Sequence, residues 1–242
     1  MVKSLTPRLK FGVIVILLGL LALWQSGSIP QASDLNARAL TVDYLDIGQG
    51  DAILITTPHR RHVLIDGGPD STILTRLGQT MPFRDHTFDL VVASHNHADH
   101  ITGINDVLTR YDVQKMWISG AIHTTNEYLK LLQQIKDRRI PTEVVWKGKT
   151  TDIDGVHFEV IFPLASQEGQ RPEDQHDATI VIRATYGQKR FLFTGDLHED
   201  HEQAILNTRP AEELKSDILK VPHHGSATGL LPDFLAAVHP SY

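Results

Sequence analysis

The sequence predicts a mixed α/β domain in which two β-sheets lie between layers of helices. From Leu40 onwards, short apolar runs alternate with turn residues, a pattern typical of strands. Helical patterns are interspersed among these runs, and both halves of the chain show this alternation of strand and helix patterns. Because each sheet must bury an apolar face, two sheets packed together and covered by helices satisfy this pattern.

The first half supplies five predicted strands and three helices. The strands are expected at 40–45, 52–56, 62–65, 88–93 and 115–119. The helices are expected at 71–80, 101–110 and 124–136, the last capped by Thr124 or Thr125. In the second half, strands are expected at 143–146, 156–162, 179–185, 190–193 and 217–221, and helices at 198–207 and 231–238.

Residues 1–32 differ from the rest of the chain. Three basic residues precede an apolar run of 14 residues from Phe11 to Trp24, and no acidic residue occurs before Asp34. This pattern is typical of a secretory signal or of a membrane anchor. As a helix the run would rise about 21 Å, less than the roughly 30 Å of a hydrocarbon core. Either interpretation, an uncleaved N-terminal helix or a cleaved signal, predicts that the domain at 33–242 is exported; a buried core helix is the structural alternative.

The charge of the predicted domain is strongly negative. The chain has 23 basic and 29 acidic residues. Removing 1–32 leaves 20 basic against 29 acidic residues, a net charge of −9. Such a domain is not a general polyanion binder. The absence of Cys excludes a thiolate metal site, a disulfide framework and a Cys nucleophile.

Three His and one Asp stand within six residues directly after the apolar segment 88–93. They are His95, His97, Asp99 and His100. Residues i and i+2 of an extended segment point the same way, so His95 and His97 can bind one ion together. Asp99 and His100 then turn toward a second position. Imidazole and carboxylate ligands suit zinc, manganese or iron; a polar surface loop is the alternative.

This cluster carries a family resemblance. His95-x-His97-x-Asp99-His100 resembles the signature of the metallo-β-lactamase superfamily, whose fold is a four-layer αββα sandwich. The segments 46–52, 64–68, 193–196 and 220–226 extend the resemblance to the hydrolase domain of the ComEC competence family. The resemblance covers residues 40–242.

The resemblance implies two divalent metal ions, with zinc expected first and manganese as the alternative. The first two His of the cluster and a third ligand would hold one ion, and Asp99 and His100 the other. Asp196 would bridge the ions and His223 would complete the second site. The third ligand of the first ion would be His176 or Asp177, which stand where ComEC-like sequences carry an Asn-Asp pair.

Four further roles are expected. Asp99 also serves catalysis by orienting the attacking water, and His224 lines the pocket as a substrate contact or proton donor. Asp66 would support the ligand loop through hydrogen bonds, and Asp51 would do likewise or form a plain turn. His198 and His201, one helical turn apart, are interpreted as a solvated helix face.

The predicted function is that of an exported metal-dependent hydrolase. A hydroxide bridging two ions would attack phosphorus or a carbonyl carbon without a protein nucleophile. By resemblance, the substrate is a phosphodiester, specifically a DNA strand during competence-type uptake. The alternatives are a secreted hydrolase of small esters, lactones or phosphoesters, and a non-catalytic DNA-binding module with an incomplete metal site.

Two departures from the ComEC pattern concern the rest of the protein. ComEC proteins carry a multi-helix channel, whereas this chain has at most one spanning segment. A separate channel protein is therefore an expected partner, unless the domain works alone outside the cell. ComEC-like domains usually continue with another strand and one more His where this chain stops at Tyr242. We interpret the domain as a fragment, or as one whose last pocket wall comes from elsewhere.

Overall fold

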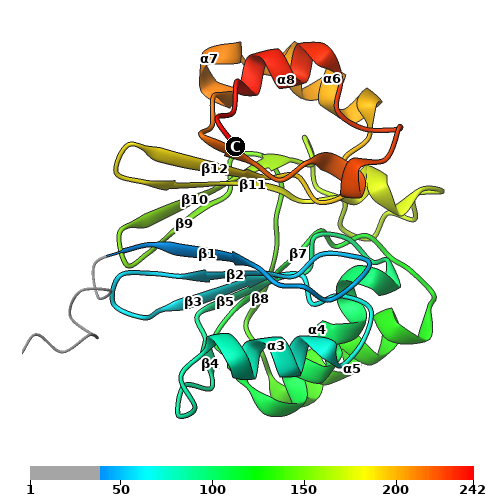
Figure 1. Cartoon of the computed structure of the whole chain (residues 1–242). Helices are drawn as coiled ribbons and strands as arrows, with labels where there is room; N and C mark the ends of the chain where they lie inside the picture. Colours follow the sequence, from blue (N-terminus) through cyan, green and yellow to red (C-terminus); the bar gives the residue numbers. More distant parts are fainter. Residues whose placement is uncertain (1–38) are drawn as a thin grey trace, which may run out of the picture. The chain divides into compact units, whose positions relative to one another are not determined.

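The computed structural model describes residues 39–242. Residues 40–242 form one compact unit, in which two β-sheets pack face to face and helices cover their outer faces (Figure 1). The predicted α/β class is therefore confirmed for these residues. The N-terminal segment expected over residues 1–32 lies outside the described residues. Within residues 39–242, no helix combines the length and the apolar character needed to cross a membrane.

The first sheet has six strands in the order β1-β2-β3-β5-β7-β8. The strands are β1 Thr41–Tyr44, β2 Ile53–Thr56, β3 His62–Ile65, β5 Leu90–Val92, β7 Met116–Ile118 and β8 Thr142–Val144. The helices that follow its strands are α3 Thr72–Thr80, α4 Ala98–Arg110 and α5 Asn126–Arg138. The pairs from β3 to β8 are parallel, so the carboxyl ends of β3, β5, β7 and β8 meet at one edge. Two short strands, β4 Thr87–Phe88 and β6 Asp112–Val113, pair separately.

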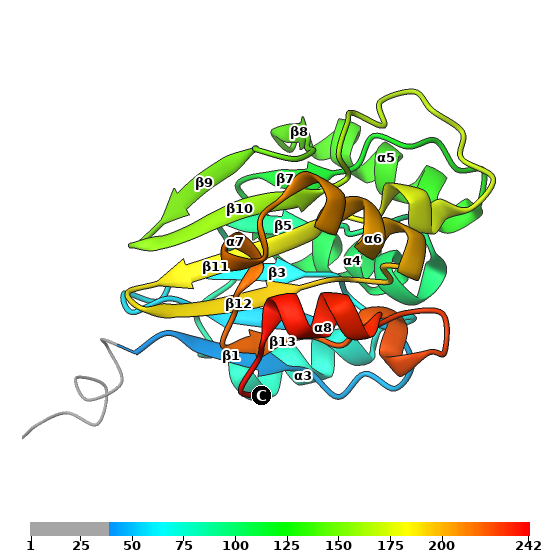
Figure 2. The same ribbon diagram turned by 90° about the horizontal axis from the view of Figure 1, so that it is seen from above.

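The second sheet has five strands in the order β13-β12-β11-β10-β9. The strands are β9 Thr150–Ile153, β10 Val156–Phe162, β11 Val181–Tyr186, β12 Lys189–Phe193 and β13 Ile218–Leu219. The α-helices on this side are α6 Glu199–Thr208, α7 Ala211–Leu214 and α8 Pro232–Val238 (Figure 2). Two 3₁₀ turns, η1 Gln175–Ala178 and η2 Pro222–Gly225, lie in connections.

Apolar side chains fill the space between the sheets. All four residues of β3 and all three of β5 are buried, which explains why these strands read as continuous apolar runs. Trp117 from the first sheet and Phe158 and Phe193 from the second belong to this core, and each is at most 2% exposed. Burial of each large side chain contributes roughly 1.5–3 kcal/mol to folding. The two sheets are thus held together as one rigid support.

The edge where the strands end carries the polar loops. The segment after β5 contains the His cluster, and the segments after β12 and β13 contain Asp196 and the His223-His224 pair. A backbone hydrogen bond from Ile180 N to the Ser94 carbonyl oxygen, 2.8 Å, joins the second sheet to the His cluster. The fold therefore brings together segments that lie up to about 130 residues apart, as parallel strand ends generally do.

The structure differs from the sequence-based expectation in several elements, among them the expected strand 88–93, which is divided between β4 and β5, and the unpredicted two-residue strand β6. Helix α4 begins at Ala98, so Asp99 and His100 lie in its first turn instead of in the preceding loop. Strand β9 and helix α7 were not predicted. The sequence of β9, Thr-Thr-Asp-Ile, has too little apolar character to be distinguished from a loop, and α7 is only four residues long. The other predicted boundaries agree within a few residues.

Candidate metal centre

The first half of the candidate site comes from the end of β5. His95 is fully buried, and its Nε2 lies 3.0 Å from Nδ1 of His97. This separation is close to that of two nitrogen atoms sharing one tetrahedral zinc at about 2.0–2.1 Å. Burial lowers the pKa of His95 well below its usual value and also lowers the pKa of His97. Both imidazoles are therefore held neutral, which is the form that binds a metal ion.

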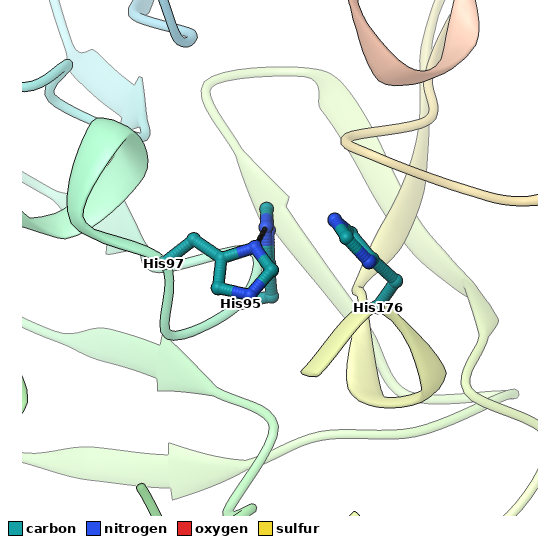
Figure 3. Close-up of side chains that lie close together, drawn as sticks. All are labelled: His95, His97 and His176. Carbon is teal, nitrogen blue, oxygen red and sulfur yellow. Dashed lines mark hydrogen bonds between the residues drawn. The ribbon is translucent and has the colours of Figure 1, made fainter. Parts of the chain in front are cut away.

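His176 faces these two rings from the other sheet's side of the cleft. The close-up shows the three imidazoles turned toward one another from two separate segments (Figure 3). The ring centroid of His176 is 4.5 Å from that of His97 and 5.3 Å from that of His95. The carboxylate of Asp174 lies 2.5 Å from His176 Nδ1 and accepts a hydrogen bond from the His176 backbone N–H at 2.9 Å. This contact turns the other ring nitrogen toward the cleft.

Asp177, the alternative to His176, is placed elsewhere. Its side chain is 50% exposed, and its Oδ1 lies 3.1 Å from Nε2 of His201. In the described structure, His176 and not Asp177 forms a group with His95 and His97. Of the two residues, His176 is therefore the one that the structure brings beside His95 and His97.

The second half of the site starts at the first turn of α4. Asp99 and His100 stand there, and a carboxylate at this position is stabilised by the positive end of the helix dipole. Gly50 explains how the neighbouring loop approaches this turn so closely. It has φ of +92°, and a Cβ at this position would lie 1.9 Å from the Asp99 carbonyl oxygen. Only glycine fits there.

Asp196 lies between the two halves. Its Oδ2 is 3.2 Å from Nε2 of His100, 3.2 Å from Nε2 of His224 and 4.0 Å from Nε2 of His95. Burial would raise the pKa of Asp196, but hydrogen bonds with His100 and His224 and the charges of His100 and His95 outweigh it and lower the pKa, so the carboxyl group is ionised. The carboxylate thus faces ligands of both predicted metal ions, as a bridging group must.

The structure places His223 and His224 in two different groups of side chains. His224, and not His223, forms a group with Asp99 and His100. His223 instead lies beside His198, with its Nδ1 3.1 Å from His198 Nε2. Both residues have positive φ, 46° and 53°, so their side chains leave the backbone in directions that a strand or helix pattern does not predict. In the structure His224 therefore groups with Asp99 and His100, and His223 groups with His176 and His198.

These donors fit divalent cations. Potential ligand atoms within 4.8 Å of one another form the groups His95-His97-His176, His95-His100-Asp196 and Asp99-His100-His224. The Oδ1 atom of Asp196 is buried and has no hydrogen-bond partner among the described residues, although the Lys220 ammonium lies 3.5 Å away, so this oxygen has a free lone pair for a metal ion. Asp66 and Asp196 are both nearly inaccessible to solvent. Two buried carboxylates are stable in a protein interior only when positive charge compensates them.

Asp66 supports the His cluster as expected. Its two carboxylate oxygens accept hydrogen bonds from Ser94 N at 2.7 Å and from Ser94 Oγ at 2.6 Å. Oδ2 also lies 2.8 Å from Nδ1 of His100. Burial would lower the pKa of His100, but the carboxylates of Asp66 and Asp196 raise it to about 10. Asp66 therefore orients His100 so that its Nε2 faces Asp196.

Lys220 was missed as a site residue by sequence reasoning. Only 8% of it is exposed, and its ammonium lies 2.5 Å from Asp51 Oδ2 and 3.5 Å from Asp196 Oδ1. It also donates to the Gly195 carbonyl oxygen at 2.8 Å. Asp51 in turn places Oδ1 3.4 Å from Nδ1 of His224. The available signal was a lysine at the end of an apolar strand, next to the His-His pair.

His198 was also missed. The prediction that His198 lies on a solvated helix face is wrong, because its side chain is only 20% exposed and contacts His223. Its Nδ1 lies 3.7 Å from Asp174 Oδ2, and its ring centroid lies 4.3 Å from that of His176. His198 is the N-cap residue of α6, with an extended backbone, so its side chain is not on the helical face that the sequence pattern predicts.

Fold and site together define a metal-dependent hydrolase of the αββα class. The comparison with family models specifies it further. Residues 61–223 match the model described as the β-lactamase superfamily domain. The chain belongs to this family, whose fold implies divalent metal binding at the His and Asp groups described above.

The curated relatives confirm the resemblance to competence proteins. The chain is 28% identical over 216 residues to ComE operon protein 3 of Bacillus subtilis. The aligned region covers 82% of this chain and 27% of the relative. It is 29% identical over 214 residues to competence protein ComA of Neisseria gonorrhoeae, covering 88% of this chain and 27% of the relative. The chain thus spans about a quarter of the length of these relatives.

Solved structures support the fold alone. The metallo-β-lactamase fold protein YhfI of Bacillus subtilis matches with a TM-score of 0.51 at 14% identity, over 83% of this chain and 82% of that one. CmlA, a diiron β-hydroxylase of Streptomyces venezuelae, matches with a TM-score of 0.51 at 13% identity, over 84% of this chain and 44% of that one.

Proposed function

We propose that this protein is an exported phosphodiesterase that hydrolyses a DNA strand in competence-type DNA uptake, using two zinc ions. The observation that carries the proposal is the position of Asp196 between two groups of ligands from four distant segments. Two cations at such a site clamp the attacking and leaving oxygens of an in-line displacement and generate a nucleophile at neutral pH. The similarity to competence proteins supports DNA as the substrate.

The residues divide into two ligand sets. His95, His97 and His176 would hold the first ion, and Asp99, His100 and His224 the second, with Asp196 shared. Asp99, in the open first turn of α4, would also orient the attacking water.

His223 replaces His224 as the proposed proton donor. His224 faces Asp99 and Asp196, whereas His223 Nε2 lies 3.9 Å from Asp196 Oδ2, and the His223 ring lies beside those of His176 and His198. The contact between His198 Nε2 and His223 Nδ1 orients the His223 ring. An N–H group at His223 Nε2 would then point toward the departing oxygen of a bound phosphodiester.

The acidic character of the domain favours strand ends over duplex DNA. With a net charge of −9 for residues 33–242, the fold lacks a general attraction for polyphosphate. Two cations would make the cleft locally positive, so that a single phosphodiester is held there. We propose that the protein acts outside the cytoplasm, either anchored by residues 1–32 or secreted. Its proposed partner is a separate channel protein.

The test combines metal analysis with nuclease assays on the full chain and on Asp99→Ala. We expect two zinc or manganese ions per wild-type chain, release of nucleotides from single-stranded DNA, and loss of the second ion and of activity in the variant. DNA cleavage that persists in Asp99→Ala would remove the proposal. Cleavage of a chromogenic phosphodiester without cleavage of DNA would assign the site to small phosphoesters instead.

A further inference from the structure

We propose that the turn Trp146–Lys149 is a binding platform for single-stranded nucleic acid, placed beside the metal centre. This inference rests on the proposed function for the identity of the ligand, and it assigns a surface to that ligand. The turn lies between β8 and β9, outside the ligand groups described above.

An indole ring is exposed on this turn. Trp146 is 43% exposed, although tryptophan is usually well buried. A cavity of about 340 Å³ lies beside it, lined by Val144, Trp146, Lys147, Gly148 and Lys149. Stacking of bases on aromatic rings is the main sequence-tolerant attraction for single strands, worth about 1–3 kcal/mol per base. The cavity is large enough for a planar base to lie against the ring.

Positive charge surrounds the ring. Lys147 and Lys149 flank it, and Lys115 lies on the same side through its contact with Glu143 at 3.8 Å. Glu143 also pairs with Lys149 at 3.0 Å, so two ammonium groups share one carboxylate. Lys147 Nζ contacts only the Thr208 carbonyl oxygen, at 3.4 Å, and has no carboxylate partner among residues 39–242. On an otherwise acidic domain, this excess of positive charge suits a phosphate backbone.

The turn is held firmly by its backbone. Lys147 N donates to the Pro163 carbonyl oxygen at 2.7 Å, and Gly148 N donates to the Val160 carbonyl oxygen at 3.0 Å. Gly148 has φ of +90°, with open space where a side chain would stand. The indole and the ammonium groups are therefore presented on a fixed support, which lowers the entropy lost on binding.

The platform lies at the same edge of the first sheet as the His cluster. Strands β5, β7 and β8 are parallel neighbours, with Val92 paired to Trp117 and Ile118 paired to Val144. His95 comes three residues after β5 and Trp146 two residues after β8. Two strand spacings, roughly 10 Å, separate β5 from β8 along the sheet. The metal centre and the platform therefore follow strands of one sheet at the same edge, with the segment after β7 and residues 168–170 between those strand ends.

The first test measures binding without cleavage, on the full chain in the presence of EDTA. A short oligothymidylate is titrated into wild type and Trp146→Phe, and the difference between their fluorescence isolates Trp146, since Trp24 and the buried Trp117 are common to both. We expect the oligonucleotide to quench the Trp146 signal, and Trp146→Ala to weaken binding about tenfold. An unquenched Trp146 with unchanged affinity in Trp146→Ala would overturn the proposal.

Charge variants provide the control. The double variant Lys147→Glu/Lys149→Glu should weaken binding and flatten its salt dependence. The matched variant Lys130→Glu, on an exposed lysine of α5, should bind like wild type. An equal loss of DNA affinity in the double variant and in Lys130→Glu would overturn the assignment of the platform to this turn. The assignment would also fall if Trp146→Ala changed self-association of the protein and left DNA binding unchanged.

The outcomes separate the platform from the proposed nuclease. If Trp146→Ala loses DNA binding while wild type cleaves no phosphodiester with added zinc or manganese, the platform stands and the nuclease proposal falls. If wild type degrades DNA and the platform variants bind it unchanged, the nuclease proposal stands and the platform falls. In an active protein, Trp146→Ala should leave cleavage of a small chromogenic phosphodiester unaltered and raise KM for DNA.

Discussion

Lys220 shows how a single buried charge can organise a metal centre without binding the metal. Its ammonium group joins Asp51, Asp196 and the Gly195 carbonyl oxygen, and so links three segments around the second ligand set. A buried cation is tolerated only because these oxygens surround it. The contact also keeps Asp51 ionised: burial would raise the pKa of Asp51, but His224 and Lys220 lower it.

Replacement of Lys220 by Met is expected to weaken metal binding. The variant preserves the length of the side chain but leaves Asp51 without its cationic partner, so that His224 loses a fixed orientation. Loss of such supporting groups commonly lowers metal affinity by about 10–100-fold. Titration with a competing chelator measures this change. Lys215→Met, on an exposed lysine, is the control; equal affinities of Lys220→Met and wild type would exclude the supporting role.

The proposed roles of His223 and His224 can be tested directly. His224→Asn should reduce the metal content by about one ion per chain, because His224 faces Asp99 and Asp196. His223→Asn should retain both ions and lose activity, since His223 lies beside His198 and is the proposed proton donor. Metal analysis by mass spectrometry, together with phosphodiesterase kinetics, checks both. The opposite pattern would restore the ligand set expected from the sequence.

At the scale of elements, α6 is tied to the second sheet by a buried ion network. Glu159 of β10 accepts hydrogen bonds from Arg209, at the end of α6, and from Arg183 of β11. Its side chain is only 16% exposed. Burial would raise the pKa of Glu159, but the two guanidinium groups outweigh it and lower the pKa. This network fixes the helix whose N-terminus carries His198.

The network predicts a pH-dependent contribution to stability. Because the folded pKa of Glu159 is lowered, its contribution is complete above the unfolded value of 4.5 and is lost as pH falls through the folded pKa. Glu159→Gln should therefore reduce the free energy of unfolding by roughly 1–2 kcal/mol at pH 7, and by less at about pH 3. Urea denaturation at both pH values measures this, with the exposed Glu168→Gln as control. A destabilisation independent of pH would contradict the account.

Sequence reasoning succeeded where one local pattern determines structure. Continuous apolar runs predicted β3 and β5, and the spacing of His95, His97 and His100 predicted a shared site at the end of β5. It failed where backbone conformation or long-range packing decides. Positive φ at His223 and His224 reverses the directions of adjacent side chains, and the N-cap position of His198 takes its side chain off the predicted helical face. Neither effect leaves a periodic signal in the sequence.

At the scale of the whole molecule, the metal centre joins the two sheets. Ligands from the first sheet meet Asp196, His176 and His224 from the second, so bound ions would crosslink the two halves of the domain. The same arrangement leaves Asp66 and Asp196 buried in close proximity to imidazoles. Metal binding and folding should therefore be coupled.

Removal of metal is expected to lower thermal stability. At a free ion concentration 100 times Kd, one bound ion adds about 2.7 kcal/mol to the stability of the folded state. For a domain of this size, that corresponds to a fall in Tm of about 5–10 °C on chelation. Calorimetry of the full chain with and without EDTA measures it. The Asp196→Asn variant should respond much less to EDTA; an equal response would place the stabilising ion elsewhere.

The most direct test of the central claim is a crystal structure of the full chain grown with zinc or manganese, with anomalous data collected at the absorption edge of the metal. The account predicts two anomalous peaks about 3.5–4 Å apart. Asp196 should lie between them, with His95, His97 and His176 at one and Asp99, His100 and His224 at the other. A single peak, or peaks that lack Asp196 as a ligand, would contradict it.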